Sequence, residues 1–251
     1  MKTGSGTGRK LWPAIFWLLL WQGASAALGQ PLLLPSPLQV AGCLWGLFRT
    51  AGYWSALALS TGRILGGFLA AEAAAAGLAA LSARFPPIRE LLSPAVAAIK
   101  AVPVASFIIL VYLWLPGRWL PSFISALMVF PPVYLNLLEG LGRRDRQLAE
   151  MARVFRVPWG RRFRHLDLPQ LLPYLRSATS LGLGLCWKAG VAAEVIGVVG
   201  GSIGERLYEA KVYFQMTDLL AWTVVIVVCS VGFEKLVLWL LRRGFAAWEG
   251  R

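Results

Sequence analysis

The chain has 251 residues, of which 57% are hydrophobic and only 15% are charged, and its mean hydropathy is +0.62. A soluble domain of this size carries about a quarter charged residues, so the composition excludes an ordinary soluble protein and indicates an integral membrane protein. The formal net charge is +13, but the lysines and arginines cluster in a few loops, which is typical of the cytoplasmic loops of membrane proteins and argues against a nucleic-acid-binding surface.

Three predicted elements occupy the N-terminal part. Residues 11–28 form a first span, which we interpret as an uncleaved anchor, although the small residues near its end also suit a signal-peptide cleavage site. Residues 29–53 form an external connection, in which the apolar piece 40–48 is predicted to be an interfacial helix. Residues 55–81 form the second span, whose many alanines and glycines favour close helix packing in a membrane.

Two further spans precede the middle of the chain. Residues 96–115 are interrupted by Lys100 and Pro103, so their apolar run is shorter than the ~20 residues that a straight span needs. We therefore predict a kinked helix that begins near Pro94. A tight external turn follows it, and residues 119–138 form the fourth span.

The last two spans follow a polar central stretch. Residues 172–199 form the fifth span, residues 200–218 an external loop, and residues 219–241 the sixth span. With the N-terminus in the cytoplasm, six spans return the C-terminus to the cytoplasm and place the central stretch there too, in agreement with the distribution of Lys and Arg. The predicted fold is all-α and polytopic, with about six transmembrane helices. The chain is expected to divide into an N-terminal helix with its external connection, a core and a cytoplasmic tail: residues 1–54, 55–243 and 244–251.

The central stretch, residues 143–169, carries eight arginines but also apolar side chains at helical spacing. The first apolar set follows the spacing i, i+3, i+4 and i+7: Leu148, Met151, Ala152 and Phe155. We predict two short amphipathic helices, hinged near Val157 and Pro158 and ended by Pro169. The pattern leaves two interpretations open: helices that lie on anionic lipid, or a docking element for a cytoplasmic partner.

Motifs for catalysis are absent from the sequence. It contains no GxxxxGK[ST], no GxSxG and no HExxH, and its three cysteines have no metal-binding spacing. We therefore expect no enzymatic activity, no metal and no other cofactor. No pattern in the sequence suits ATP hydrolysis by the chain itself.

Residues 150–169 resemble the EAA signature of binding-protein-dependent ABC importer permeases. That signature reads Glu-Ala-Ala, three residues, Gly, nine residues, Ile, one residue and Leu-Pro, and its spacing holds here without a gap from Glu150 to Pro169. Met151 and Leu166 are mild departures. Similarity to the nitrate/sulfonate/taurine-type subgroup extends over about residues 55–243.

One departure from the signature is more severe. Arg156 stands where the family has a glycine that permits the turn between the two short helices. Either Val157 and Pro158 set this turn, or Arg156 adopts a strained conformation.

The resemblance implies a permease of an ABC importer in a bacterial inner membrane, with the segment around Glu150 as the coupling helix. The implied partners are ABC ATPase subunits in the cytoplasm, an extracytoplasmic solute-binding protein and a second permease copy in a homodimer. A small anion such as a sulfonate, taurine or nitrate would pass between the two copies by alternating access. The residues expected to couple to the ATPase lie within the loop 140–170: Leu148, Glu150, Met151, Ala152, Phe155, Arg156, Pro158, Leu166, Leu168 and Pro169.

Four charged residues inside the predicted spans are candidates for the translocation pathway: Arg63, Glu72, Lys188 and Glu194. A charge within a membrane costs at least a few kcal/mol and usually pairs or lines a cavity. Lys188 and Glu194 are about 120° apart on a helix, so partners on the second span are more plausible than each other. Both readings stay open: interhelical pairing, or a pathway in which Lys188 attracts an anion.

Two alternative functions belong to other classes. An ion-gradient-driven secondary transporter would need inverted repeats and midplane ion sites, and no such repeat is visible. A membrane scaffold or sensor would use the basic loop to bind anionic lipid.

Overall fold

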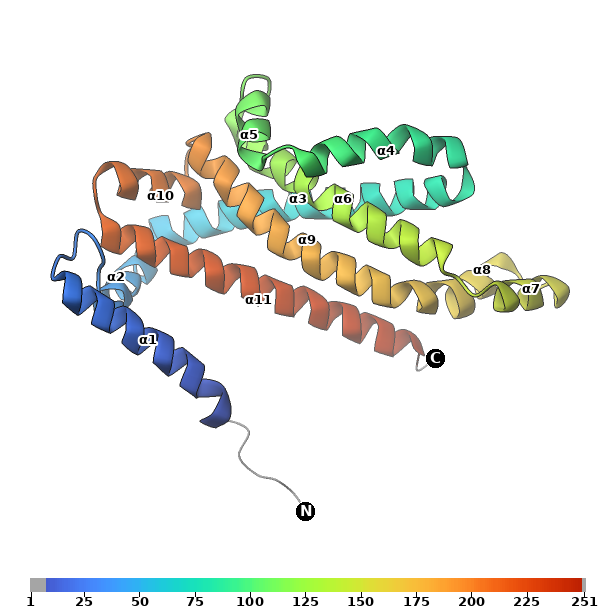
Figure 1. Cartoon of the computed structure of the whole chain (residues 1–251), viewed down its shortest axis with the longest axis horizontal. Coiled ribbons are helices and arrows are strands. Elements are labelled where there is room, and N and C mark those ends of the chain that lie inside the picture. Colours follow the sequence, from blue (N-terminus) through green and yellow to red (C-terminus); the bar gives the residue numbers. More distant parts are fainter. Residues whose placement is uncertain (1–7, 250–251) are drawn as a thin grey trace, which may run out of the picture.

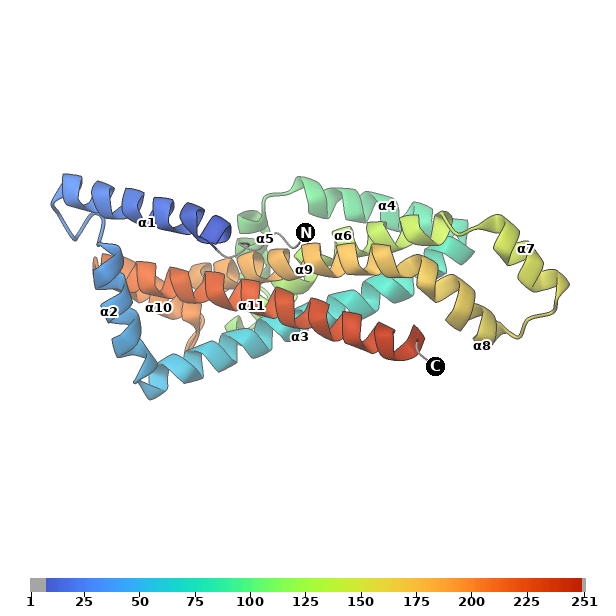
Figure 2. The ribbon, with the colours of Figure 1, turned by 90° about the horizontal axis from the view of Figure 1, so that it is seen from below.

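The computed structural model describes residues 8–249, and every regular element in this range is helical. Figures 1 and 2 show an elongated molecule whose long helices run roughly along one axis. In chain order the elements are α1 (Gly8–Leu28), α2 (Pro37–Phe48), α3 (Ala51–Arg84), α4 (Pro86–Ala101), α5 (Val104–Tyr112), η1 (Gly117–Trp119), α6 (Leu120–Gly142), α7 (Arg146–Val154), α8 (Trp159–Arg162), η2 (Phe163–Asp167), α9 (Leu168–Ile196), α10 (Ile203–Val212) and α11 (Met216–Glu249).

Three long helices, α3, α6 and α9, form the centre of the molecule. Glycines set how closely they approach. A Cβ atom on Gly67 of α3 would lie 2.1 Å from the carbonyl oxygen of Ser122 on α6, and one on Gly190 of α9 would lie 2.6 Å from Oγ of Ser125 on α6. Since no side chain fits at either position, the small residues permit the close helix contacts that the sequence predicted.

Three helical segments in residues 8–249 are long and apolar enough to cross a membrane: Ala51–Arg84, Gly117–Gly142 and Met216–Leu241. The pair α4 and α5 passes the same test only as a bent unit, and Trp12–Leu28 and Pro37–Phe48 are shorter apolar helices. The predicted all-α polytopic fold is therefore confirmed. The helix expected at 40–48 is also present as α2, which begins with a capping box between Ser36 and Gln39.

The predicted third span is wrong in form. Instead of one kinked helix that begins near Pro94, α4 begins at Pro86 and includes Pro94, and α5 follows after a bend of 103°. The break is at Val102, whose backbone is extended (ψ 133°). Pro103 favours this break, because the proline ring disfavours the helical region for the residue before it.

The predicted end of the central helices at Pro169 is also wrong. The helical chain continues from α8 through the π-helical turn η2 into α9, and the N–H of Leu168 donates to the carbonyl oxygen of Phe163, five residues earlier. Pro169 directly follows this turn and has no N–H to donate. The wider π turn thus lets the helix pass the proline.

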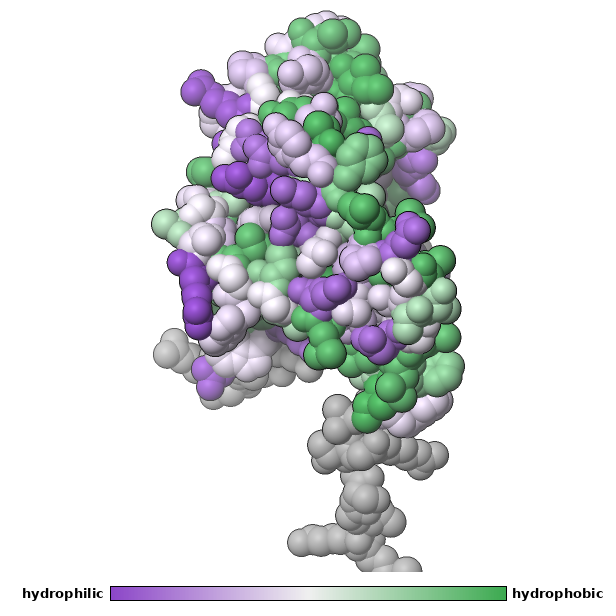
Figure 3. Space-filling view, turned by 90° about the vertical axis from the view of Figure 1, so that its left-hand side faces the viewer, coloured by the Kyte–Doolittle hydropathy of each residue, from purple (hydrophilic) through white to green (hydrophobic). Residues whose placement is uncertain are grey.

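The predicted external loop 200–218 contains a helix, α10. Its N-cap is Ser202, whose side chain accepts a hydrogen bond from the backbone N–H of Glu205 at 3.0 Å. Figure 3 looks onto the end of the molecule where α10 and α2 lie, and it shows hydrophilic residues gathered in the middle of this face. The hairpin of α7 and α8 lies at the opposite end (Figure 1).

Candidate functional site

The first feature of interest is the hairpin, residues 143–169, which contains α7, α8 and η2. Asp145 begins α7 by accepting hydrogen bonds from the N–H groups of Gln147 (2.8 Å) and Leu148 (3.3 Å). The amphipathic helix predicted here is therefore present, and its sequence contains its own start signal.

The turn that ends α7 places Arg156 in the left-handed region, with φ of 49°. The N–H of Val157 donates to the carbonyl oxygen of Ala152 (2.9 Å) and the N–H of Arg156 donates to that of Arg153 (3.1 Å). These two bonds define a Schellman motif, in which glycine is the usual left-handed residue. Of the two alternatives for this turn, the structure has the strained one: Arg156 itself takes the glycine conformation.

Asp167 ties the base of the hairpin together. Its side chain is 11% exposed, and its two oxygens meet Nη1 of Arg144 (3.2 Å) and Nε of Arg162 (3.5 Å). The N–H of Asp145 also donates to Oε1 of Gln170 (2.8 Å). These contacts join the end of α6 to α8 and the start of α9. The sequence prediction missed Asp167, although a single acid between the eight arginines and the Leu-Pro pair was a visible signal.

The hairpin exposes large apolar side chains. Phe155 is 74% exposed and Met151 45%, and Leu148 lies at the edge of the same surface. Val154 (78%) and Trp159 (79%), which the prediction did not include, are exposed as well, and the Trp159 ring stacks on Phe163 at 5.6 Å.

The other predicted coupling residues differ in exposure. Ala152 is only 1% exposed, so it packs inward and cannot act as an anchor for a partner. Leu166 and Leu168 are partly buried at the base, whereas Glu150, Arg156, Pro158 and Pro169 are exposed.

The second feature is a buried polar junction around Glu194 at the other end of α9. Glu194 is fully buried, and its Oε2 accepts hydrogen bonds from Oγ of Ser60 (2.8 Å) and the N–H of Gly204 (3.2 Å). Oγ of Ser60 also accepts from the N–H of Ile203 (2.8 Å). The carboxyl group thus lies at the N-terminus of α10, where backbone N–H groups favour an acid, and it joins α3, α9 and α10.

The four predicted intramembrane charges do not form one cluster. Arg63 acts electrostatically on Glu194, and its buried Nη1 has no hydrogen-bond partner within the described residues. Glu72 interacts with Thr179 of α9, about 13 Å further along α3 than Arg63. Lys188 is exposed on α9. The structure therefore places Arg63 close enough to Glu194 for an electrostatic interaction between α3 and α9, and it brings neither Glu72 nor Lys188 to them.

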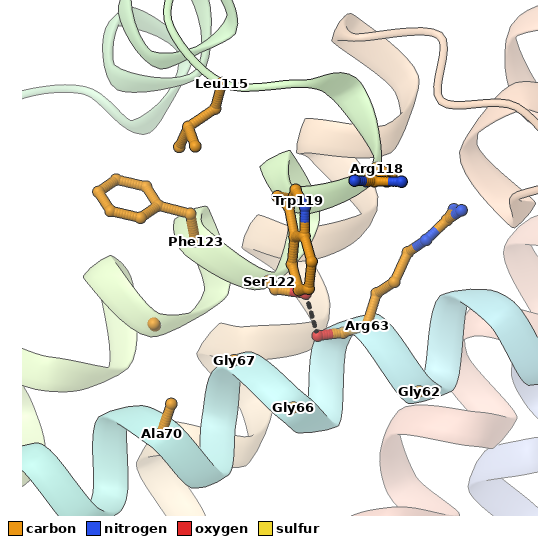
Figure 4. Close-up of a pocket in the computed structure, with 11 residues that line it drawn as sticks. Gly62, Arg63, Gly66, Gly67, Ala70, Leu115, Arg118, Trp119, Ser122 and Phe123 are labelled. Atoms are coloured by element: carbon orange, nitrogen blue, oxygen red, sulfur yellow. Dashed lines mark hydrogen bonds between the residues drawn. The ribbon is translucent and has the colours of Figure 1, made fainter.

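The third feature is a groove of about 880 Å³ between α3 and the segment η1–α6. Figure 4 shows Arg63 extending from α3 toward the end of the groove where Arg118 of η1 lies. Oγ of Ser122 donates to the carbonyl oxygen of Arg63 (2.8 Å), which fixes α3 against α6 along the floor. Trp119 and Phe123 form part of the opposite wall.

Comparison with known proteins identifies the family. Residues 73–243 match the family model of the binding-protein-dependent transport system inner membrane component. The riboflavin transport system permease protein RibX of Chloroflexus aurantiacus is 29% identical over 253 residues, which cover 95% of this chain and 91% of the relative. The putative aliphatic sulfonates transport permease protein SsuC of Escherichia coli is 29% identical over 232 residues (92% and 88%), and the taurine transport system permease protein TauC of the same organism is 27% identical over 243 residues (94% and 88%). The chain therefore belongs to the binding-protein-dependent transport system inner membrane components, the family that the EAA-like spacing indicated.

Proposed function

We propose that this permease works in an ATP-driven importer and that its hairpin, residues 143–169, docks on a cytoplasmic ATPase subunit. The observation that carries the proposal is the exposed apolar surface of Met151, Val154, Phe155 and Trp159 on an element that Asp167 holds in place. Exposure of apolar side chains of this size to water is unfavourable, and a contiguous exposed apolar patch marks a surface that a partner covers. A short amphipathic helix set into an apolar groove is a common way to do so.

The charge of the hairpin restricts the partner surface. Arg143, Arg153, Arg156 and Arg161 are all exposed around the apolar side chains. An ATPase groove that receives α7 is therefore expected to be apolar at its centre and acidic at its rim. This chain carries no nucleotide-binding motif, so ATP hydrolysis takes place on the partner.

The proposed arrangement follows from the hairpin. Its end of the molecule, and both termini, are cytoplasmic, and the opposite end with α10 meets a solute-binding protein. A second copy of the chain packs beside this one, and the solute passes between the two copies.

The substrate is proposed to be a small anion. Relatives are named for aliphatic sulfonates, taurine and bicarbonate, and another is named for riboflavin, so the names alone do not determine the substrate. An anion is favoured because Arg63 and Arg118 line the same groove, and no acidic residue is among the described residues that do so.

The docking proposal is tested by co-purification of the ATPase encoded with the permease. Phe155→Asp places a charge in the apolar surface and is expected to lower the recovered ATPase at least tenfold, because burying an unpaired charge costs several kcal/mol. Tyr213→Asp is the matched control, since Tyr213 is similarly exposed (70%) but lies at the opposite end. Equal recovery with both variants would refute docking through α7.

The same variants examine the lipid-binding alternative. If the hairpin bound anionic lipid instead of a protein, wild type would bind phosphatidylglycerol vesicles, Phe155→Asp would weaken that binding, and no ATPase would co-purify with either. Co-purification in zwitterionic nanodiscs, where anionic lipid is missing, is the expected result for a protein partner.

A further inference from the structure

The groove between α3 and η1–α6 has features of a ligand site. Its volume of about 880 Å³ falls within the range of pockets that hold small organic molecules, about 300–1,000 Å³. Gly62, Gly66 and Ala70 form the wall on α3, and Trp119, Phe123 and Ala126 belong to the wall on η1–α6. Small side chains on one wall and aromatic ones on the other leave a slot for a flat or slender apolar body.

The charge of the groove has one sign. Arg63 and Arg118 line it, and no acidic residue is among the described residues that do so. Arg118 lies over the Trp119 ring at 5.7 Å and forms no ion pair within residues 8–249. Arg63 also interacts electrostatically with Glu194, whose Oε2 accepts bonds from Ser60 and Gly204 while its Oε1 has no hydrogen-bond partner among the described residues.

The position of Arg63 brings two cations to one end of the groove. It lies twelve residues into α3, about 18 Å along the helix, and its side chain extends toward Arg118 on the turn η1 (Figure 4). A planar guanidinium group is well suited to an oxyanion.

We infer that this groove binds an organic anion, with a sulfonate or carboxylate head between Arg63 and Arg118 and an apolar body against Trp119 and Phe123. The inference rests on the proposed transport function and narrows its substrate class. An inorganic ion such as nitrate would fill only a small part of the groove and leave its apolar walls uncovered. An organic anion satisfies both the charge and the walls.

The test measures binding to the permease–ATPase complex in phosphatidylcholine nanodiscs by calorimetry, with three probes of matched chemistry. Benzenesulfonate has both the head and the body, methanesulfonate has the head alone, and benzenesulfonamide has the same shape without the charge. Benzenesulfonate is expected to bind about tenfold or more tightly than either of the others, because a charged hydrogen bond and a buried ring each contribute about a factor of ten.

Variants locate the site. Arg118→Gln and Arg63→Gln are each expected to weaken benzenesulfonate binding about tenfold. Arg118 is exposed on a surface turn, so its substitution leaves the fold intact even if Arg63→Gln does not. Arg49→Gln is the matched control: Arg49 also lies over a tryptophan, Trp45, at 5.1 Å, but outside the groove. Equal binding by Arg118→Gln and wild type would overturn the inference.

Two further arms separate other outcomes. In phosphatidylglycerol nanodiscs the affinity of the wild type for benzenesulfonate is expected to stay within about threefold of its value in phosphatidylcholine. If the wild type instead binds benzenesulfonate more weakly in phosphatidylglycerol, and Arg118→Gln shows no such difference between the two lipids, the groove holds a lipid phosphate and the inference is wrong. Co-purification of the ATPase is measured on the same preparations. If benzenesulfonate does not bind but the ATPase still co-purifies, only this inference is refuted. If no ATPase co-purifies with the wild type, the proposed function is refuted.

Discussion

Replacing Asp167 by Asn should loosen the hairpin. Charged hydrogen bonds contribute about 1.5–3 kcal/mol when well buried, but Arg144 and Arg162 are 35% and 30% exposed, and the second contact is long at 3.5 Å. We therefore take about 1 kcal/mol for each contact, or about 2 kcal/mol in total. Since about 1.4 kcal/mol corresponds to a factor of ten, the equilibrium for local opening of the hairpin should rise about thirtyfold.

Hydrogen exchange followed by mass spectrometry measures this directly. Amides of α7 and α8 should exchange about thirtyfold faster in Asp167→Asn, while those of α3 and α6 stay unchanged. Glu139→Gln is the control, because the Glu139–Arg143 pair at 2.9 Å is at least half exposed on both sides and such pairs contribute at most about 1 kcal/mol. Equal exchange in the two variants would show that Asp167 does not hold the hairpin. The double variant with Arg144→Gln should cost less than the sum of the single changes, since both remove one contact.

Three other predictions follow from single positions. Gly204→Ala should lower the stability of the chain by about 2–3 kcal/mol in thermal unfolding, because its Cβ would lie 2.2 Å from α9, whereas Gly200→Ala, with nothing within 4 Å, should have no effect. Arg156→Gly should slow exchange at the end of α7 by about threefold, since it removes a left-handed conformation that costs an L-residue about 1–2 kcal/mol, less the entropy cost of glycine; Arg156→Ala should give no such gain. Cys43 should react slowly with maleimide at pH 8, because burial and the Asp218 carboxylate that accepts its Sγ–H at 2.7 Å raise the pKa of the thiol to about 12, and Asp218→Asn should speed the reaction by lowering that pKa.

Features encoded within a few residues were predictable from the sequence. The amphipathic spacing around Met151 located α7, and the EAA-like register singled out Arg156 as the residue at the turn. Val198 (φ 44°) and Phe214 (φ 55°) occupy the same left-handed position after α9 and α10. Neither was predicted, because nothing in the local pattern distinguishes a valine or a phenylalanine that tertiary packing forces into this conformation.

Features that depend on packing were not predictable. Pro103 marks a break, but the bend of 103° between α4 and α5 depends on the helices that they meet. Glu194 was recognised as an unusual charge, yet its partner Ser60 is 134 residues away in the chain. The α3 wall of the groove was visible only as small residues typical of helix packing, and the pairing of Arg63 with Arg118 required the fold.

The continuation of the helix past Pro169 has a mechanical consequence. Because η2 accommodates the proline, one continuous helical backbone runs from Trp159 on the hairpin to Glu194 at the N-terminus of α10. α9 alone has 29 residues, about 44 Å at the rise of an α-helix. A helix that ended at Pro169 would leave a flexible joint between the hairpin and the bundle, whereas a continuous helical backbone, even with the π turn η2 and Pro173 inside it, couples its two ends more tightly. In the proposed importer, a displacement of the hairpin by the ATPase therefore reaches the Glu194 junction, which lies beside Arg63 and the groove.

Glu194→Gln, which keeps the shape but removes the charge that faces Arg63, should leave ATPase binding intact and change how strongly ATP hydrolysis drives uptake. If the coupling of ATP hydrolysis to uptake is unchanged in this variant, the Glu194 junction takes no part in the mechanism.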